Sequence, residues 1–289
     1  MGHRPLVKWV GGKRQLLNEI KSRMPYHYNT YFEPFVGGGA LLFDELPYKA
    51  VISDINTELI YLYETVRDYY ALNELVALLD YHKANHSEEY YNEIRAMDRQ
   101  PNFNSLPKVV RAARLMYLNK TCFNGMYRVS SQGYYNVPMD KGRKEISLYG
   151  NNIYNIFSYL VNSRIVILNA DFESAVATAK SGDFVYFDPP YDKTRIDSFT
   201  KYARGDFDQA AQERLAKVFK ELTARGVYVM LSNSNTEFVR QLYDGYNIEV
   251  IKARRSINSD GEKRGRVDEV LIRNYVNSDE SKLILNESK

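Results

Sequence analysis

Four consecutive residues, Asp188-Pro189-Pro190-Tyr191, have the side chains and backbone needed for chemistry on an amine. The exocyclic amine of a nucleobase is a poor nucleophile because its lone pair is delocalised into the ring. The Asp188 carboxylate and the Pro189 carbonyl could each accept one N–H bond, which would turn the lone pair toward an electrophile and stabilise the developing positive charge. The Tyr191 ring could stack on the base. The alternative is that Asp188 only caps a turn.

The residues before this motif place it at the end of a buried strand. Residues 184–187 are aromatic or β-branched and follow a Ser-Gly-Asp turn, which is typical of a short buried strand. The two prolines lack N–H donors and restrict φ, so the chain must leave the sheet at this point. Because open α/β sheets bind ligands at the carboxyl ends of their strands, we expect the motif to lie at a ligand site.

A glycine turn and an acid form a second candidate site. Residues 31–36 predict a strand that ends in Gly-Gly-Gly at 37–39, where the backbone can approach a ligand closely. Residues 50–56 predict the next strand, and Asp54 near its end has the separation expected for a carboxylate that binds ribose hydroxyls. Asp54 could instead be the N-cap of the helix that follows. The order of the two segments favours ribose binding.

The N-terminal residues 6–13 end in Gly-Gly-Lys, which is typical of a loop that brings the Lys13 ammonium close to an anionic or polar ligand. The segment is not a phosphate-binding P-loop, because the first glycine is missing and Arg14 replaces the required Ser or Thr. Apolar residues at helical spacing predict a helix over 14–24. Residues 232–235, Ser-Asn-Ser-Asn, are expected to cap a later helix.

Composition limits the classes of protein. The chain has 289 residues, 44% of them hydrophobic, enough for one large domain with an insertion or for two domains. The single cysteine, Cys122, excludes an internal disulfide and a cysteine-based zinc site and is typical of a reducing cytosol. With no signal peptide or long apolar run, we expect a soluble cytoplasmic protein without a membrane partner or a metal. The net charge of +3 by itself argues neither for nor against binding to nucleic acid.

Together the motifs resemble those of a known family. Lys-Trp-Val-Gly-Gly-Lys at 8–13, Glu-Pro-Phe-Val-Gly-Gly-Gly-Ala at 33–40, Ser-Asp-Ile-Asn at 53–56 and Asp-Pro-Pro-Tyr at 188–191 are similar in type and order to those of the DNA adenine-N6 methyltransferases of the Dam/DpnM type. The resemblance covers nearly the whole chain. It implies transfer of methyl from S-adenosyl-L-methionine to adenine N6 in double-stranded DNA containing GATC. We further expect the protein to be a monomer.

The family resemblance also implies the fold and the domains. It implies an α/β protein with a Rossmann-like methyltransferase sheet and an inserted, mainly helical DNA-recognition domain that carries a β-hairpin. Residues 1–57 and 162–276 would form the catalytic and cofactor-binding domain, 58–161 the recognition domain and 277–289 a disordered tail. Helical periodicity in the first part of the insertion agrees with this expectation.

Individual roles carried over by motif position fall into three groups. The residues expected to be catalytic are Asp188, Pro189 and Tyr191. Those expected to bind the cofactor are Trp9, Lys13, Phe35, Gly37, Gly39, Asp54, Asp171, Phe172 and Asp188. Those expected to contact DNA are Lys8, Phe123, Asn124, Met126, Arg128 and Pro138.

The expected DNA contacts come mainly from one projecting segment. Asn124-Gly125 and Gln132-Gly133 are turn signals and residues 134–138 look extended, so a β-hairpin or a long loop is expected. The Arg128 guanidinium could donate a bidentate pair to guanine, and an asparagine with an apolar wedge could hold open the base stack. The alternative is that Phe123 and Met126 pack the hairpin onto the helices and that Arg128 is a solvated charge.

Several alternatives stay open. Asp171, after the strand predicted over 164–168, could be only a helix cap. Residues 192–205 are predicted to form a mobile lid. The basic residues within 254–266 could bind phosphates or form a solvated hairpin tip. A methyltransferase of RNA or of another amine could share Asp-Pro-Pro-Tyr, and a DNA-binding protein without catalysis is the alternative of another class.

Overall fold

The computed structural model describes residues 2–142, 145–191, 207–254 and 266–276. The expected lid at 192–205, the expected tail at 277–289 and most of the basic stretch at 254–266 lie outside the described residues. Within the described residues, no helix has both the length and the apolar character needed to cross a bilayer.

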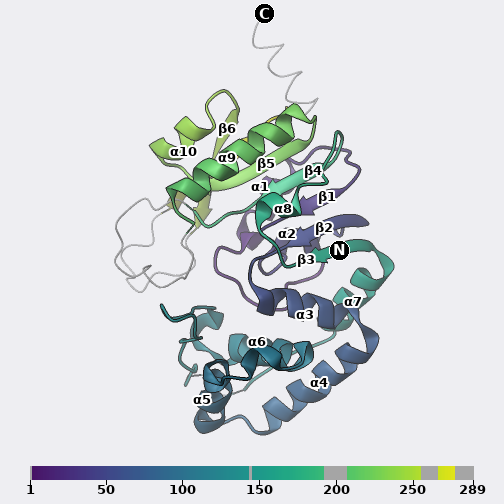
Figure 1. Ribbon diagram of the computed structural model, residues 1–289, viewed down its shortest axis with the longest axis vertical. Coiled ribbons are helices and arrows are strands. Elements are labelled where there is room, and N and C mark those ends of the chain that lie inside the picture. Colours follow the sequence, from purple (N-terminus) through teal and green to yellow (C-terminus); the bar gives the residue numbers. More distant parts are fainter. Residues whose placement is uncertain (1, 143–144, 192–206, 255–265, 277–289) are drawn as a thin grey trace, which may run out of the picture.

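A seven-stranded sheet, in the order β3-β2-β1-β4-β5-β7-β6, forms the centre of the described chain (Figure 1). β7 is antiparallel to both of its neighbours and the other pairs are parallel. The strand order reverses between β1 and β4, which is where open α/β sheets bind their ligands. The predicted Rossmann-like α/β fold is therefore confirmed. The strands are β1 Tyr31–Glu33, β2 Lys49–Ser53, β3 Arg164–Leu168, β4 Phe184–Phe187, β5 Tyr228–Ser234, β6 Asn247–Arg254 and β7 Arg266–Arg273.

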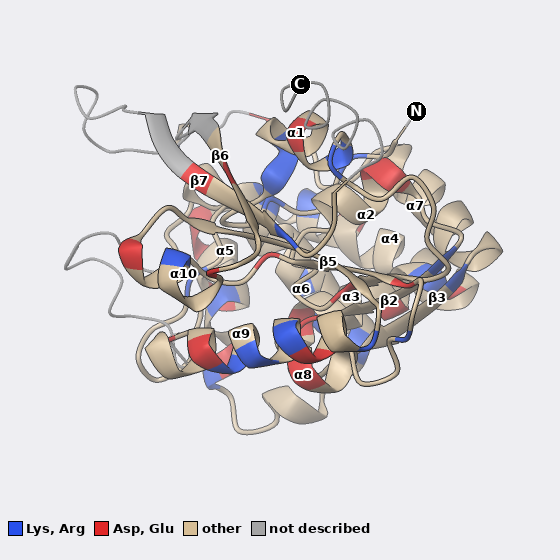
Figure 2. Cartoon of the chain, turned by 90° about the horizontal axis from the view of Figure 1, so that it is seen from above, with Lys and Arg blue, Asp and Glu red and all other residues tan. Residues whose placement is uncertain are grey.

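Two hydrophobic cores lie on the two faces of the sheet. Successive side chains of a strand point to opposite faces, so Tyr31 and Tyr186 enter one core while Phe32 and Val185 enter the other. Figure 2 shows α8 and α9 on one side of the sheet and α1 and α2 on the other. The first side has α8 Phe172–Ala175, α9 Gln209–Ala224 and α10 Glu237–Leu242, and the second has α1 Leu17–Lys21 and α2 Ala40–Glu45.

The chain between β2 and β3 is mainly helical, as predicted. Figure 1 shows α3 and α7 next to the sheet and α4, α5 and α6 farther from it. The core continues through them without a break, since buried Tyr91 and Tyr117 belong to the same cluster as Tyr31. The division of the chain into domains stays a prediction. The helices are α3 Thr57–Arg67, α4 Tyr69–Ala84, α5 Glu88–Ala96, α6 Lys108–Thr121 and α7 Asn152–Asn162.

The segment after α6 does not form a regular β-hairpin, because its two antiparallel bridges are isolated and form no continuous ladder. A 3-10 turn, η4 Phe123–Gly125, comes first, and both Asn124 (φ 57°) and Gly125 (φ 65°) are left-handed there. Two isolated antiparallel bridges follow, Cys122 with Met139 and Val129 with Tyr135. The Asn-Gly signal is therefore confirmed as a tight turn, because both central residues have the positive φ of a type I′ β-turn and Met126 N donates to the Phe123 carbonyl at 3.4 Å.

Two other local predictions differ from the structure. The helix expected over 14–24 is a 3-10 turn, η1 Lys13–Gln15, followed by the short α1, because Leu16 between them has φ −108° and ψ 3°. The helix after β5 is capped by Thr236, whose side chain accepts from Val239 N, and not by residues 232–235. Ser232 to Ser234 belong to β5 instead.

Candidate active site

Asp188 directly follows β4, at the edge of the sheet where the strand order reverses. The Lys13 ammonium pairs with Asp188 Oδ1 at 2.8 Å, and the Ser232 hydroxyl donates to the same oxygen at 2.9 Å. Ser232 Oγ in turn lies 3.0 Å from the hydroxyl of Tyr186. Because both donors meet at Oδ1, they fix the rotation of the carboxylate and leave acceptor capacity at Oδ2. Such an oxygen can accept an N–H of a bound amine.

Lys13 joins the N-terminal loop to the Asp-Pro-Pro-Tyr motif. Its side chain is only 6% exposed, and its ammonium also donates to the Gly11 carbonyl at 2.9 Å. The same ammonium lies 4.4 Å from the centre of the Tyr191 ring, a cation–π distance. The structure therefore brings together two segments that the sequence singled out separately.

Tyr191 and the proline turn are anchored by Glu269 and Gln212, which the sequence did not single out, and by Asn233, which was expected to be part of a helix cap. The Tyr191 hydroxyl donates to Glu269 Oε2 at 2.6 Å, and burial raises the pKa of Tyr191 well above its ordinary value, so its phenol stays neutral. The Gln212 amide donates to the Pro190 carbonyl at 3.0 Å, and the Asn233 amide donates to Gln212 at 3.0 Å. These bonds hold the backbone that follows Asp188.

The glycine turn and Asp54 form one hydrogen-bonded unit. Asp54 Oδ2 accepts from Gly37 N at 3.0 Å and Oδ1 accepts from Asn56 N at 2.8 Å. Burial raises the pKa of Asp54, while the N–H bonds from Asn56 and Gly37 act in the opposite direction. The alternative that Asp54 is the N-cap of α3 is wrong, because the Asn56 side chain accepts from Glu58 N and Leu59 N.

Close packing explains why glycine is needed in this turn. Gly37 has φ 48°, and a Cβ there would lie 2.8 Å from Cδ1 of Trp9. Gly39 has φ 71°, and a Cβ there would lie 2.7 Å from Cε2 of Phe43. The hydroxyl of Tyr63 donates to the Gly37 carbonyl. The left-handed backbone and the packed rings leave no room for a side chain.

Two aromatic pairs border this region. The Trp9 ring stacks on Tyr127 with a centroid distance of 4.8 Å, and the Phe35 ring stacks on Phe172 at 5.4 Å. Tyr127 belongs to the segment after α6, so the first pair links the N-terminal loop to the expected DNA-contacting segment. Sequence reasoning did not single out Tyr127.

Asp171 does cap a helix, as the simpler interpretation proposed. Its carboxylate accepts from Glu173 N at 3.1 Å at the start of α8. It also pairs with the Arg214 guanidinium at 2.8 Å, and that guanidinium lies 4.4 Å from the centre of the Phe172 ring. The cofactor role of Asp171 and Phe172 stays a prediction.

The residues expected to contact DNA are mostly exposed, with the exception of Met126. Phe123 is 50% exposed, and its N–H donates to the Pro138 carbonyl at 3.0 Å, so the two residues are neighbours. Arg128 donates from Nε to Oδ1 of Asn136 at 2.7 Å, which holds its guanidinium in place. Met126 packs against the core, as the simpler interpretation proposed. The others that lie exposed are Lys8, Asn124, Arg128 and Pro138.

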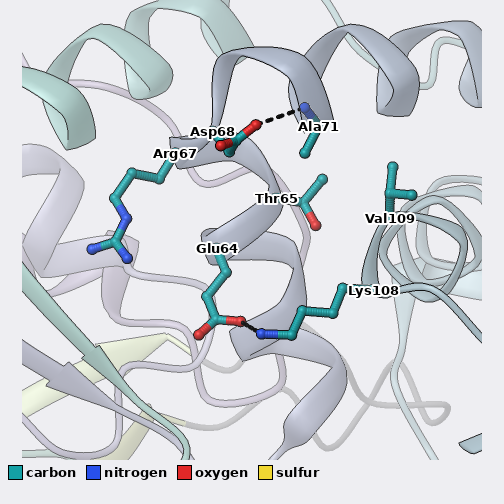
Figure 3. Close-up of a pocket in the computed structure, with 7 residues that line it drawn as sticks. All are labelled: Glu64, Thr65, Arg67, Asp68, Ala71, Lys108 and Val109. Carbon is teal, nitrogen blue, oxygen red and sulfur yellow. Dashed lines mark hydrogen bonds and ion pairs between the residues drawn. The ribbon is translucent and has the colours of Figure 1, made fainter. Parts of the chain in front are cut away.

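A hollow of about 530 Å³ between α3, α4 and α6 is a separate feature (Figure 3). Its charged groups already have partners, since Glu64 pairs with Lys108 at 2.6 Å and Asp68 accepts from Ala71 N at 2.8 Å. None of the expected site residues lines it. The hollow therefore adds nothing to the candidate active site.

Comparisons with known proteins agree with the geometry. The model of the D12 class N6 adenine-specific DNA methyltransferases matches residues 9–257. The type II methyltransferase M1.LlaDCHI of Lactococcus lactis subsp. cremoris is 44% identical, over 95% of this chain and 96% of that protein. The type II methyltransferase M.MjaIII of Methanocaldococcus jannaschii is 39% identical, over 94% and 99%. A DNA adenine methylase of Haemophilus influenzae is 32% identical, over 93% of each.

Proposed function

Because this chain belongs to the D12 class of N6 adenine-specific DNA methyltransferases, we propose that it methylates adenine N6 within GATC, using S-adenosyl-L-methionine, after the base has rotated out of the duplex. The observation that carries the proposal is the Asp188 carboxylate, held through Oδ1 by Lys13 and Ser232 at the end of β4. Membership of the family argues against the RNA methyltransferase and the non-catalytic DNA-binding protein that the sequence left open.

The residues around the glycine turn fit S-adenosyl-L-methionine. Each Asp54 oxygen accepts one N–H bond and has capacity for another, which suits two ribose hydroxyls. The left-handed Gly37 lets the backbone approach a ligand, and the Phe35 ring offers a flat surface for adenine. In the proposal Trp9, Lys13, Gly39, Asp171 and Phe172 complete the cofactor site.

The cofactor supplies an electrophilic methyl group, and the protein prepares the amine. Asp188 Oδ2 and the Pro189 carbonyl accept the two N–H bonds of N6, which turns the nitrogen lone pair out of the plane of the ring. The new N–C bond forms as the S–C bond breaks, and both acceptors stabilise the positive charge on N6. The methylated aminium is acidic enough to lose its proton afterwards, so no strong base is required. Tyr191, fixed by Glu269, stacks on the base.

The exposed surface of the segment after α6 fits a DNA-reading role. Arg128 is exposed and pre-oriented by Asn136, which suits bidentate donation to guanine O6 and N7. In the proposal Met126 and Arg128 discriminate the outer base pairs and Lys8 contacts the first guanine. Phe123 and Asn124 fill the gap left by the extruded base, and Pro138 contacts the groove. The proposed partner is double-stranded DNA, bound by a monomer.

A transfer assay tests the proposed reaction and site together. Labelled S-adenosyl-L-methionine is incubated with one GATC duplex and with duplexes in which a single outer base pair is changed, and the modified base is mapped. N6-methyladenine confined to GATC supports the whole proposal. Methylation of another adenine site keeps the chemistry but refutes GATC, and no methylation of any duplex refutes the proposed reaction.

The role of Asp188 has its own test. Replacement of one preorganised group that stabilises transition-state charge lowers kcat by about 100- to 1000-fold. Asp188→Ala is therefore expected to lose at least this much activity while DNA binding, measured by fluorescence anisotropy, stays substantial. Glu213→Gln, on the exposed side of α9, serves as a matched loss of one carboxylate. Retained activity in Asp188→Ala contradicts the assigned role.

A further inference from the structure

We propose that Asn119 is a positioning residue that joins the N-terminal loop and the segment after α6 into a single DNA-reading surface. The inference rests on the proposed reading roles of Lys8 and Arg128, but Asn119 itself is only 2% exposed and does not reach the surface. Sequence discrimination would then depend on a buried residue that makes no contact with DNA.

The Asn119 side chain binds both segments at once. Its Oδ1 accepts from Lys8 N at 2.9 Å, and its Nδ2 donates to the Lys8 carbonyl at 2.8 Å and to the Gly125 carbonyl at 3.0 Å. Both N–H groups of the amide are therefore used, together with one of its two acceptor positions. Because the N–H and the carbonyl of Lys8 bond to the same side chain, Asn119 restricts both the position and the direction of the Lys8 backbone.

Packing between Lys8 and Gly125 completes the junction. Gly125 has φ 65°, and a Cβ there would lie 2.6 Å from Cδ and 3.2 Å from Cβ of Lys8. The aliphatic part of Lys8 thus lies directly against the glycine backbone. Trp9, the residue after Lys8, and Tyr127, two residues after Gly125, stack at 4.8 Å. The two segments therefore contact one another at two places besides the Asn119 amide.

This junction matters for reading two base pairs together. Lys8 and Arg128 are proposed to address different parts of one site, so their spacing must match the spacing of the bases. Hydrogen bonds weaken steeply with misalignment, so a small relative shift of the two segments would weaken the contacts that Lys8 and Arg128 make together on the cognate site. A duplex with one changed base pair already lacks one of these contacts, so its methylation would fall less. A single good bidentate contact discriminates by roughly five- to 150-fold, and a loss of about tenfold in site preference is expected when Asn119 is removed.

Asn119→Ala and a matched control test the inference. Thr121→Val is the control, because Thr121 is also buried in α6 and loses one hydrogen bond, to the Tyr117 carbonyl, that does not involve either segment. The measured quantity is the ratio of kcat/KM on the GATC duplex to kcat/KM on each duplex with one changed outer pair. Asn119→Ala is expected to lower this ratio about tenfold, and Thr121→Val is expected to keep the wild-type ratio.

The outcomes separate this inference from the proposed function. An unchanged ratio in Asn119→Ala, or an equal loss of kcat/KM on every duplex, overturns the positioning role. If Asn119→Ala does not fold, Gly125→Ala disturbs the same junction from the exposed segment, and its ratio decides in the same way. A wild-type preference for another site refutes GATC alone, and the ratio is then measured around that site. Wild-type protein without any preference refutes both.

Discussion

Replacing Glu33 with glutamine is expected to stabilise the protein at neutral pH, although Glu33 lies in one of the motifs that define the site. Glu33 is the last residue of β1 and is 3% exposed. Its Oε2 accepts from the Tyr31 hydroxyl at 2.8 Å. Burial, with a smaller contribution from the negative charge of Asp188, raises the pKa of Glu33 from 4.5 to about 8, although the bond from Tyr31 acts in the opposite direction.

The size of the effect follows from proton linkage. The unfolded chain loses the Glu33 proton near pH 4.5, whereas the folded protein keeps it until about pH 8. Between these values the folded state binds one more proton, so the free energy of unfolding falls by about 1.4 kcal/mol for each pH unit as the pH rises. The loss reaches about 3 kcal/mol at pH 7 and about 5 kcal/mol above pH 8. Glutamine has no proton to lose, and its oxygen can still accept from Tyr31.

Urea unfolding at pH 5, 6, 7 and 8 measures this difference. Glu33→Gln is expected to match wild type near pH 4.5 and to gain stability steadily as the pH rises. Glu213→Gln, which removes an exposed carboxylate, is the control and is expected to follow wild type throughout. Other titrating groups cancel in the comparison. A stability difference that is constant with pH, or a Glu33→Gln variant that is less stable at pH 8, would show that Glu33 is already ionised in the folded protein.

Three further predictions concern the site and the helices around it. Ser232→Ala removes one hydrogen-bond donor to the Asp188 carboxylate. Because hydrogen bonds to charged groups contribute about 1.5–3 kcal/mol, kcat in single-turnover assays should fall at least about tenfold while DNA binding is kept. An unchanged kcat contradicts the role of Ser232. Gly39→Ala places a Cβ 2.7 Å from Cε2 of Phe43 on a backbone with φ 71°. The free energy of unfolding, measured by thermal unfolding, should fall by about 1–3 kcal/mol, and a variant as stable as the wild type refutes the steric argument. Burial lowers the pKa of His82 from 6.5 to about 4, so between these pH values the unfolded chain binds a proton that the folded protein does not. The free energy of unfolding of the wild type should therefore fall by about 3 kcal/mol as the pH is lowered from 6.5 to about 4. His82→Phe should lack this loss in urea unfolding at pH 7 and 5, and an equal acid sensitivity in both proteins rules out His82 as its source.

The sequence was enough to predict the fold class and the motifs because each signal is local. An apolar run followed by two prolines predicts a strand that stops, and the structure has β4 ending at Phe187. Three consecutive glycines after a strand predict a backbone that must turn tightly, and Gly37 and Gly39 are both left-handed. Strand ends of a parallel sheet gather at one edge, so the place of Asp188 after a predicted strand already indicated a ligand site at that edge.

Only the tertiary structure decided which groups surround those motifs. Ser232 looked like a helix cap, yet it lies in β5 and bonds to Asp188, 44 residues away in the chain. Sequence reasoning gave Asn119 no role, yet its amide holds Lys8, 111 residues away. The raised pKa of Glu33 depends on burial, which arises only when the helices cover the sheet. A hydrogen bond forms within about 3 Å and only in a suitable direction. Such a condition depends on the packing of the whole chain and not on the spacing of residues along it.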